Sequence, residues 1–156
     1  MSASPARQAF EALATQLATI TVSAGYRQTV RTILTDFSKL NLNVAESDLP
    51  LIEIVDDMTT YQHMASASFW AEMNVILFVV APKAWTDGQM EDLISDIMKC
   101  LFGGSSNASG NTGITLGGVV QSIHLVDSRG DLNLIESNRT YIFKIMMKQL
   151  RKTYTG

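Results

Sequence analysis

The stretch from Ser66 to Ala81 alternates between two sets of side chains along its whole length. The first set is apolar throughout and comprises Ala67, Phe69, Ala71, Met73, Val75, Leu77, Val79 and Ala81. The second set changes from polar to apolar, as Ser66, Ser68, Glu72 and Asn74 give way to Ile76, Phe78 and Val80. A period of two residues is typical of a β-strand, so the pattern predicts a half-buried strand that continues into a fully buried one. The polar end of this strand therefore leaves the core.

The composition is that of an ordinary folded domain. The chain has 156 residues, of which 46% are hydrophobic and 17% are charged, and this is enough to bury a core without metals or disulfides. The formal net charge of −3 argues against a nucleic-acid binder, because contacts to phosphates require a basic face. We therefore expect a single domain over residues 1–156.

Cysteine content and apolar runs indicate the compartment. The single cysteine, Cys100, has no partner for an internal disulfide, and its place on an apolar helix face indicates a small core residue. Met1 to Arg7 contains no apolar signal-peptide core, and the longest apolar run, Val75 to Ala81, is too short to span a bilayer. We expect no membrane contact and a reducing compartment.

Two amphipathic helices are predicted. The first opens with Ser4 and Pro5, and its apolar stripe consists of Phe10, Leu13, Leu17 and Ile20. Thr86 and Gln89 form a capping box at the start of the second helix, and Gly103 is expected to end it with a left-handed cap. The stripe of the second helix consists of Met90, Leu93, Ile94, Ile97, Met98, Leu101 and Phe102. Each stripe needs a sheet or a helix to cover it.

Five strands are predicted around these helices. Their expected ranges are 26–37, 51–55, 66–81, 115–127 and 139–150. A loop is expected from Asp56 to Ser66, and a turn from Asp127 to Asn138. Residues 103–118 are rich in Gly, Ser and Asn, so a flexible loop is expected at about 103–114. The order helix, three strands, helix, two strands predicts an α+β fold with one mixed sheet and both helices packed on one face.

Catalytic motifs are not found in the sequence. His63 and His124 have no ligand partners at the spacing of a metal site. The Gly-rich loop lacks the strand-to-helix position and the Lys-Ser/Thr ending of a phosphate-binding loop. Asp56 and Asp57 are the best candidate pair for a divalent cation, but adjacent carboxylates at a strand end are usually solvated. We expect no enzyme activity, no metal and no cofactor.

Several short residue signals accompany the order of the elements. Gly25-Tyr26 precedes a strand rich in Thr and Val, Leu49-Pro50 leads into a short apolar strand, and Phe69-Trp70 lies in the long strand. An amphipathic helix and two closing strands follow. From the first helix to the last strand, this succession resembles the tail terminator proteins of tailed bacteriophages.

The resemblance implies a structural virion protein that is assembled in the host cytoplasm. Proteins of this family form a ring, most often a hexamer, that caps the tail tube, ends its polymerisation and joins the tail to the neck. The implied partners are other copies of the chain, the tail tube protein and a neck or head completion protein. DNA would pass through the lumen without specific binding, which agrees with the mildly acidic charge.

Exposed strand ends and mobile loops are suited to subunit contacts. We therefore expect interface residues at the exposed ends of two strands and in the Gly-rich loop. The expected set is Tyr26, Arg27, Arg31, Ser68, Trp70, Glu72, Gly104, Ser105, Ser106, Asn107 and Asn111.

Three other interpretations are compatible with the sequence. The chain could be another small phage neck or tail assembly protein with the same architecture. It could be a small ligand-binding α+β regulatory domain, with the Gly-rich loop as a lid over a pocket. It could also be an enzyme that holds a metal with Asp56, Asp57 and His63.

Overall fold

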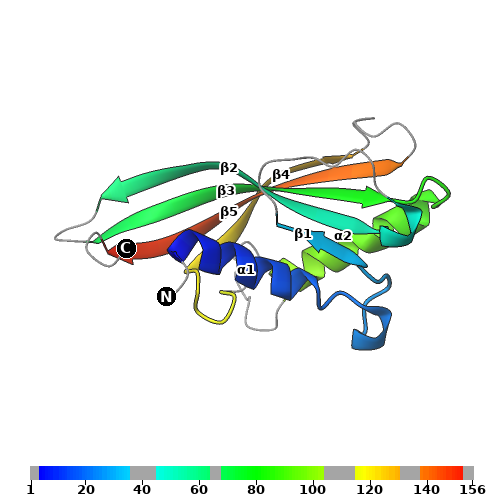
Figure 1. Cartoon of the computed structure of the whole chain (residues 1–156), viewed down its shortest axis with the longest axis horizontal. Coiled ribbons are helices and arrows are strands. Elements are labelled where there is room, and N and C mark those ends of the chain that lie inside the picture. Colours follow the sequence, from blue (N-terminus) through cyan, green and yellow to red (C-terminus); the bar gives the residue numbers. More distant parts are fainter. Residues whose placement is uncertain (1–3, 36–44, 64–67, 104–114, 131–137, 153–156) are drawn as a thin grey trace.

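One mixed five-stranded sheet forms the centre of the structure (Figure 1). The computed structural model describes residues 4–35, 45–63, 68–103, 115–130 and 138–152. In chain order, the elements are α1 (Pro5–Leu17), η1 (Val22–Ala24), β1 (Thr32–Leu34), η2 (Glu46–Asp48), β2 (Leu51–His63), β3 (Ser68–Ala81), α2 (Asp87–Phe102), β4 (Ser122–Gly130) and β5 (Arg139–Lys152). The sheet order is β1-β2-β3-β5-β4, with β1 parallel to β2 and all other neighbours antiparallel. The predicted α+β class and element order are confirmed.

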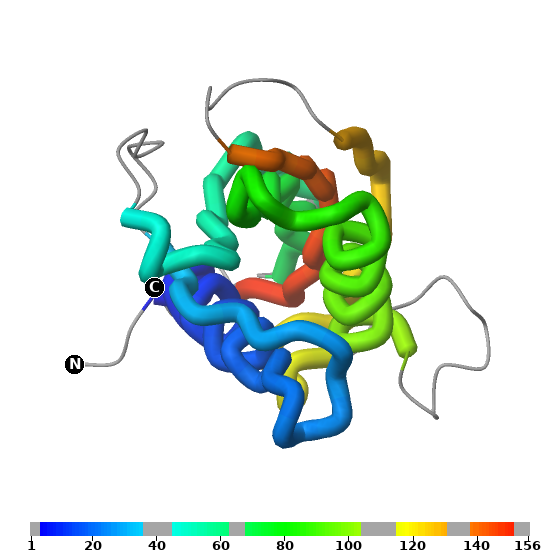
Figure 2. Tube along the Cα trace, turned by 90° about the vertical axis from the view of Figure 1, so that its right-hand side faces the viewer, coloured from blue at the N-terminus to red at the C-terminus, as the bar shows by residue number. Residues whose placement is uncertain are grey.

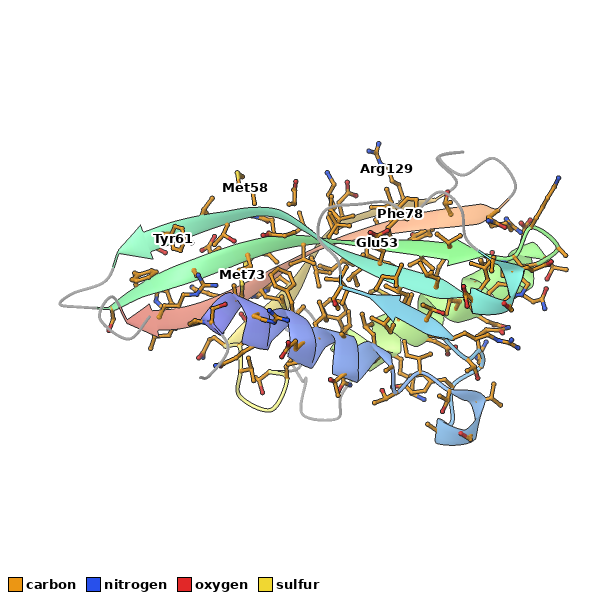
Figure 3. The ribbon with its side chains drawn as sticks, in the orientation of Figure 1. Glu53, Met58, Tyr61, Met73, Phe78 and Arg129 are labelled. Atoms are coloured by element: carbon orange, nitrogen blue, oxygen red, sulfur yellow. The ribbon has the colours of Figure 1, made fainter. Side chains whose placement is uncertain are left out.

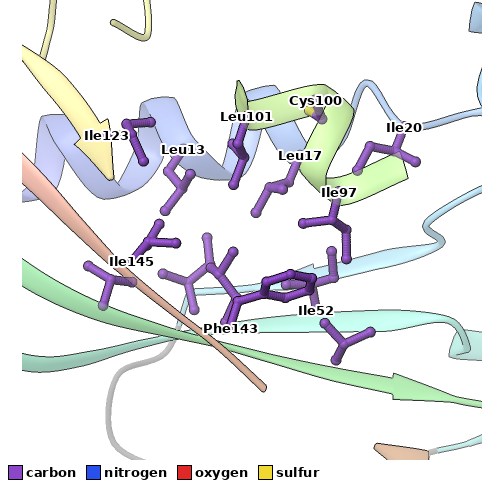
Figure 4. Close-up of a cluster of buried hydrophobic side chains, with 14 of the residues drawn as sticks. Leu13, Leu17, Ile20, Ile52, Ile97, Cys100, Leu101, Ile123, Phe143 and Ile145 are labelled. Atoms are coloured by element: carbon purple, nitrogen blue, oxygen red, sulfur yellow. The ribbon is translucent and has the colours of Figure 1, made fainter. Parts of the chain in front are cut away.

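Both helices cover one face of the sheet, here called the helix face. The strands twist strongly about one another, and α1 and α2 close the same side of them (Figures 1 and 2). The largest buried cluster joins the predicted helix stripes to inward side chains of four strands (Figure 4). Its fully buried members include Leu13, Leu17, Ile20, Ile52, Ile54, Met73, Leu77, Leu93, Ile97, Leu101, Ile123 and Phe143.

A second, smaller cluster lies on the opposite face, here called the far face. It consists of Leu49, Leu51, Phe78, Val80 and Ile142. This is the region in which both predicted faces of the long strand become apolar, and β3 is buried on both faces from Leu77 to Ala81. The change from a half-buried to a fully buried strand is therefore confirmed.

The second helix has the predicted boundaries, but its end differs in conformation. Thr86 and Gln89 form the expected capping box. Gly103 has a φ of −93°, so the predicted left-handed cap is wrong. A Cβ at this glycine would lie 2.8 Å from the carbonyl oxygen of Lys99, which indicates that close backbone approach accounts for the glycine.

The first predicted strand is much shorter than expected. Among the described residues of the predicted range 26–37, only Thr32–Leu34 pairs with β2, and residues 36–37 lie outside the described part of the chain. The preceding residues form hydrogen bonds to other parts of the structure, including the Arg27 and Gln28 amides with Asp96 and the Val30 amide with the Ile20 carbonyl. These contacts hold the backbone away from the strand ladder.

The second strand is much longer than the predicted Leu51–Val55. It continues to His63 because β3 supplies an antiparallel partner along its whole length. The loop predicted from Asp56 is therefore wrong up to His63, and residues 64–66 lie outside the described part of the chain.

The last two strands also differ from prediction at their ends. Thr115 to Gln121 forms turns in place of the start of a strand, with positive φ at Leu116, Gly117 and Gly118. Ser128 to Gly130 belongs to β4 rather than to the predicted turn, and β5 continues to Lys152. Within the described residues, no helix is long and apolar enough to cross a membrane.

Candidate functional site

Three strands continue from the helix-covered part of the sheet toward one end, where the cover by the helices stops. This strand arm comprises residues 58–63 of β2, 68–74 of β3 and 146–152 of β5, and it extends past the N-terminal end of α1 (Figure 1). Met73 and Met147, at the start of this segment, still belong to the main core cluster. Three large apolar side chains of the arm are solvent-exposed: Met58 by 56%, Tyr61 by 61% and Leu150 by 49%. Such side chains favour contact with another protein when they gather on one element.

A β-bulge marks the base of the arm. The β2–β3 register shifts between Asp56, which is opposite Val75, and Met58, which is opposite Asn74. Paired residues share a face, so Asp56 lies on the helix face and Met58 lies on the far face. Without the bulge at Asp57, two residues this far apart in a strand would lie on the same face. Figure 3 shows Met58 pointing away from the helices. The bulge therefore determines which β2 side chains of the arm lie on the helix face and which lie on the far face.

The helix face of the arm carries an ordered aromatic and cationic cluster. The rings of Tyr61 and Phe69 meet edge to face with centroids 5.4 Å apart, and the guanidinium carbon of Arg151 lies 5.9 Å from the Tyr61 ring. Arg151 also donates hydrogen bonds to Gln149 Oε1 at 2.9 Å and to Met73 Sδ at 3.2 Å. These contacts hold Tyr61 in place although most of its surface is open to solvent.

The far face of the arm carries a tryptophan beside a lysine. Lys148 Nζ lies 4.8 Å from the centroid of the Trp70 ring, and Lys148 is opposite Glu72 in the ladder. Leu150 is the cross-strand partner of Trp70. Ser68, Trp70 and Glu72 therefore share one face, as predicted, and this face combines apolar and charged groups.

Gln149 fixes the arm to the rest of the protein. This buried side chain donates hydrogen bonds from Nε2 to the carbonyl oxygens of Pro5 and Val119, each at 3.1 Å. One amide group therefore joins β5 to the start of α1 and to the turn before β4. Both bonds are partly buried, and they link the arm to the core at two points.

The strand β4 forms the opposite edge of the sheet. Its register to β5 shifts between Leu125 and Asp127, which leaves Val126 in a bulge, and Leu125 and Val126 are 39% and 58% exposed. Arg129 is also exposed on the far face (Figure 3). His124, predicted on a strand, shares a hydrogen bond of 2.9 Å with Ser122.

The other predicted interface residues lie elsewhere. Arg27 pairs through Nη1 with Asp92 at 3.1 Å, and its backbone amide is held by Asp96. Arg31 is exposed before β1, and its amide donates to the carbonyl of Pro50. The prediction that Arg27 and Arg31 lie on a strand is therefore wrong, and they do not join the arm.

Tyr26 is partly buried and packs against the main core cluster. Lys99 Nζ lies 5.2 Å from its ring, and burial, with the nearby thiol of Cys100, raises the pKa of Tyr26. Burial likewise raises the pKa of Cys100, whose Sγ donates to the Gln16 carbonyl at 3.3 Å. The bonds between Gln16 and Cys100 join α1 to α2, which agrees with a structural role for the cysteine. Gly104, Ser105, Ser106, Asn107 and Asn111 lie outside the described residues.

The metal interpretation does not fit the position of its residues. Asp57 and His63 belong to one extended strand, so their Cα atoms are separated by about 20 Å at the usual rise per residue. No group of three or more His, Cys, Asp or Glu side chains suited to a metal occurs in the part of the chain that the structure describes.

A cavity of about 410 Å³ lies between the start of α1 and the edge of β2. Phe10 lines it together with Thr35 and Asp56, and with the exposed ion pair of Arg7 and Glu11, whose Nε and Oε1 atoms are 3.0 Å apart. Its volume is within the range of small-molecule sites. Arg7 and Glu11 are paired with each other and Ser4 caps α1, so Thr35 and Asp56 are the lining polar residues that could orient a ligand.

No protein-family model and no curated protein matches this sequence.

Proposed function

We propose that this protein is a tail terminator of a tailed bacteriophage. In this proposal, copies of the chain assemble into a ring on the end of the tail tube, end its polymerisation and join the tail to the neck. The observation that carries the proposal is the strand arm, because it exposes Met58, Tyr61 and Leu150 on an element that the rest of the sheet holds rigid. A rigid arm with exposed apolar side chains is suited to docking on other proteins.

The order of the elements adds support. Two of the three residue signals of the resemblance lie at the expected elements: Leu49-Pro50 precedes β2, and Phe69-Trp70 lies in β3. The third does not, because Gly25-Tyr26 is followed by a strand only at Thr32. Among the described residues, the surface offers an arm and strand edges, and it contains no group of three or more His, Cys, Asp or Glu side chains that could hold a metal. These features favour an assembly role over chemistry.

A terminator must satisfy a simple energetic condition. It binds the growing end of the tube better than a further tube subunit does, and its other side offers no copy of that end. Loss of the protein therefore removes the stop signal and leaves the tube protein itself unchanged.

The test is a nonsense mutation of this gene in its phage. We expect DNA-filled capsids without tails, together with free tails of abnormal or irregular length, in electron micrographs of the lysate. Adding the purified wild-type protein should restore joining without any cofactor. Tails of normal length attached to capsids would rule out the proposal, whereas tails of normal length that stay unattached would indicate a neck protein instead.

A ligand-binding domain is the second candidate function, and the cavity beside α1 is the observation that favours it. Native mass spectrometry of the purified protein tests this possibility. A bound small molecule that is lost in a Phe10→Trp variant, which fills the cavity, would favour the ligand-binding function. A mass equal to that of the chain alone would count against it.

A further inference from the structure

Two edges of the sheet have no described strand on their outer side. The first is the outer edge of β2 along the arm, because β1 pairs with β2 only at Leu51–Glu53. The second is the outer edge of β4, which ends the strand order. A free strand edge presents unpaired amide and carbonyl groups, and natural proteins usually protect it with charge, proline or a short length. Residues 58–63 of β2 carry none of these protections, since their sequence is MTTYQH.

The exposed apolar side chains gather on these two edges. Within the described residues, the exposed large apolar side chains are Val22, Met58, Tyr61, Leu125, Val126 and Leu150. Met58 and Tyr61 belong to the β2 edge, and Leu125 and Val126 belong to the β4 edge. Four of the six therefore lie where a further strand would cover them.

The two edges carry groups that can pair by charge. The carboxylates of Asp56 and Asp57 are exposed at the base of the β2 edge, whereas the β4 edge carries the exposed guanidinium of Arg129 together with the exposed carboxylate of Asp127. A contact that brings Arg129 close to Asp56 and Asp57 is favoured by charge, and this helps to set its register.

The strand directions allow the two edges to pair. Strand β2 runs antiparallel to β3, β3 to β5 and β5 to β4, so β2 and β4 run in opposite directions within one subunit. A rotation about an axis inclined to the strands, as in a closed barrel, keeps β2 and β4 antiparallel and introduces a stagger between copies. Copies related by such a rotation would therefore bring β2 of one and β4 of the next together as an antiparallel pair.

We propose that the β2 edge of one copy pairs with the β4 edge of a second copy, so that the sheets continue from subunit to subunit. The pairing rests on the proposed function, because a contact between two different patches generates a closed ring when the rotation closes. The β2 and β4 edges would then form the contacts between neighbouring subunits of that ring.

The ladder within one subunit defines which residues a given stagger between copies would bring together. Within one subunit, Leu125 is level with Asp56, and Arg129 is level with Glu53. If the second copy is shifted by four ladder positions toward the tip of the arm, its Leu125 comes level with Tyr61 on the helix face, and its Arg129 comes level with Met58, next to Asp57. A stagger between strands is required whenever a sheet closes on itself.

Lysine substitutions on each edge test the pairing, with sedimentation velocity of the purified protein as the measurement. Met58→Lys and Val126→Lys should each weaken self-association by at least about tenfold, which corresponds to about 1.4 kcal/mol. Val22→Lys and Leu150→Lys are the matched controls, because they add the same charge at exposed apolar positions away from the two edges. Circular dichroism of all four variants should match that of the wild type.

A mixture of the two edge variants separates this pairing from a two-fold contact. Met58→Lys keeps an intact β4 edge and Val126→Lys keeps an intact β2 edge, so the mixture should form one-to-one dimers although neither variant associates alone. A mixture that stays monomeric, or a wild-type protein that stays monomeric at its highest soluble concentration, would overturn the pairing. The same conclusion would follow if the control variants lost association as strongly as the edge variants.

A disulfide tests the stagger. In a Cys100→Ala background, the double variant Tyr61→Cys, Leu125→Cys should form covalent ladders on oxidation, because cross-strand partners lie within disulfide distance. Neither single variant should form ladders, and the absence of ladders in the double variant would overturn the stagger.

The edge pairing and the tail function can fail separately. If Met58→Lys and Val126→Lys both still form rings, the edge pairing is refuted and the tail function stands. If rings depend on the two edges but the nonsense mutant has normal tails attached to capsids, only the tail function is refuted.

Discussion

The strand β3 passes through two different environments. From Met73 to Ala81, its helix-face side chains are covered by α1 and α2 and are almost completely buried. From Ser68 to Glu72, the same strand has the same neighbours in the sheet, yet most of its side chains are only partly buried. The helix-face residues are apolar in both halves. The difference arises from what packs on the sheet and not from the strand itself.

This contrast shows how each half is stabilised. In the covered half, burial of apolar area supplies most of the free energy. In the arm, the ladder and a few cross-strand pairs remain, and such pairs typically contribute about 0.2–1 kcal/mol each. Mutations should therefore have large effects on unfolding in the covered half and small effects in the arm, where assembly is the sensitive property.

The largest expected effect is a cavity in the covered half. Leu93→Ala or Ile97→Ala removes a fully buried side chain of α2 from the cluster, and the free energy of unfolding should fall by about 2–5 kcal/mol. Urea denaturation measures the loss. Val22→Ala, at an exposed position, is the control, and a loss below about 0.5 kcal/mol in the α2 variants would show that this helix face is not core.

A smaller loss is expected at Asp96. Its buried carboxylate accepts hydrogen bonds from the Arg27 amide and, at 2.7 Å, from the Gln28 amide. Asp96→Ala leaves these donors without an acceptor and should cost about 1–3 kcal/mol in urea denaturation. Asp92→Ala is the matched control, because it removes only an exposed ion pair with Arg27, which is worth about 0–1 kcal/mol. Equal losses in both variants would contradict the structural role of Asp96.

The sequence predicted the fold better than it predicted the strand boundaries. Helix α2 was placed correctly because its capping box and its apolar stripe lie within one short segment. The extent of β2 could not be read locally, since Met58 to His63 becomes a strand only through pairing with β3. In the same way, the Thr- and Val-rich residues after Tyr26 favour a strand by propensity, but the contact to Asp96, 69 residues away, overrides it.

The candidate site was predicted only in part. Ser68, Trp70 and Glu72 were expected at an exposed strand end and do share the far face of the arm. Met58, Tyr61, Leu125 and Val126 were missed, because a sequence shows which residues are apolar but not which strand edges stay uncovered. The strand-favouring residues Thr59, Thr60 and Tyr61 were the local signal that could have indicated the longer β2.

The root of the arm offers a test of intermediate size. Gln149→Leu keeps the side-chain volume but removes the two hydrogen bonds to Pro5 and Val119, and stability should fall by about 1–2 kcal/mol. Hydrogen exchange should become faster at the amides of the arm than at those of α2, because the arm then loses its attachment to the core. Uniformly faster exchange across the sheet would indicate that the arm and the covered half unfold as one unit.

The smallest expected effect concerns Leu150 on the far face of the arm. This side chain is 49% exposed and lies across from Trp70, so Leu150→Ala should change the free energy of unfolding by no more than about 0.5 kcal/mol. Urea denaturation of this variant beside Leu93→Ala gives the direct comparison of the two halves. The same substitution should leave the β2–β4 pairing intact, because β5 lies inside the sheet. If the far face of the arm is the surface that docks on a tube or neck protein, the substitution should weaken that docking. A loss of several kcal/mol at Leu150 would show that the arm is part of the stability core, and the contrast between the two regions would then be wrong.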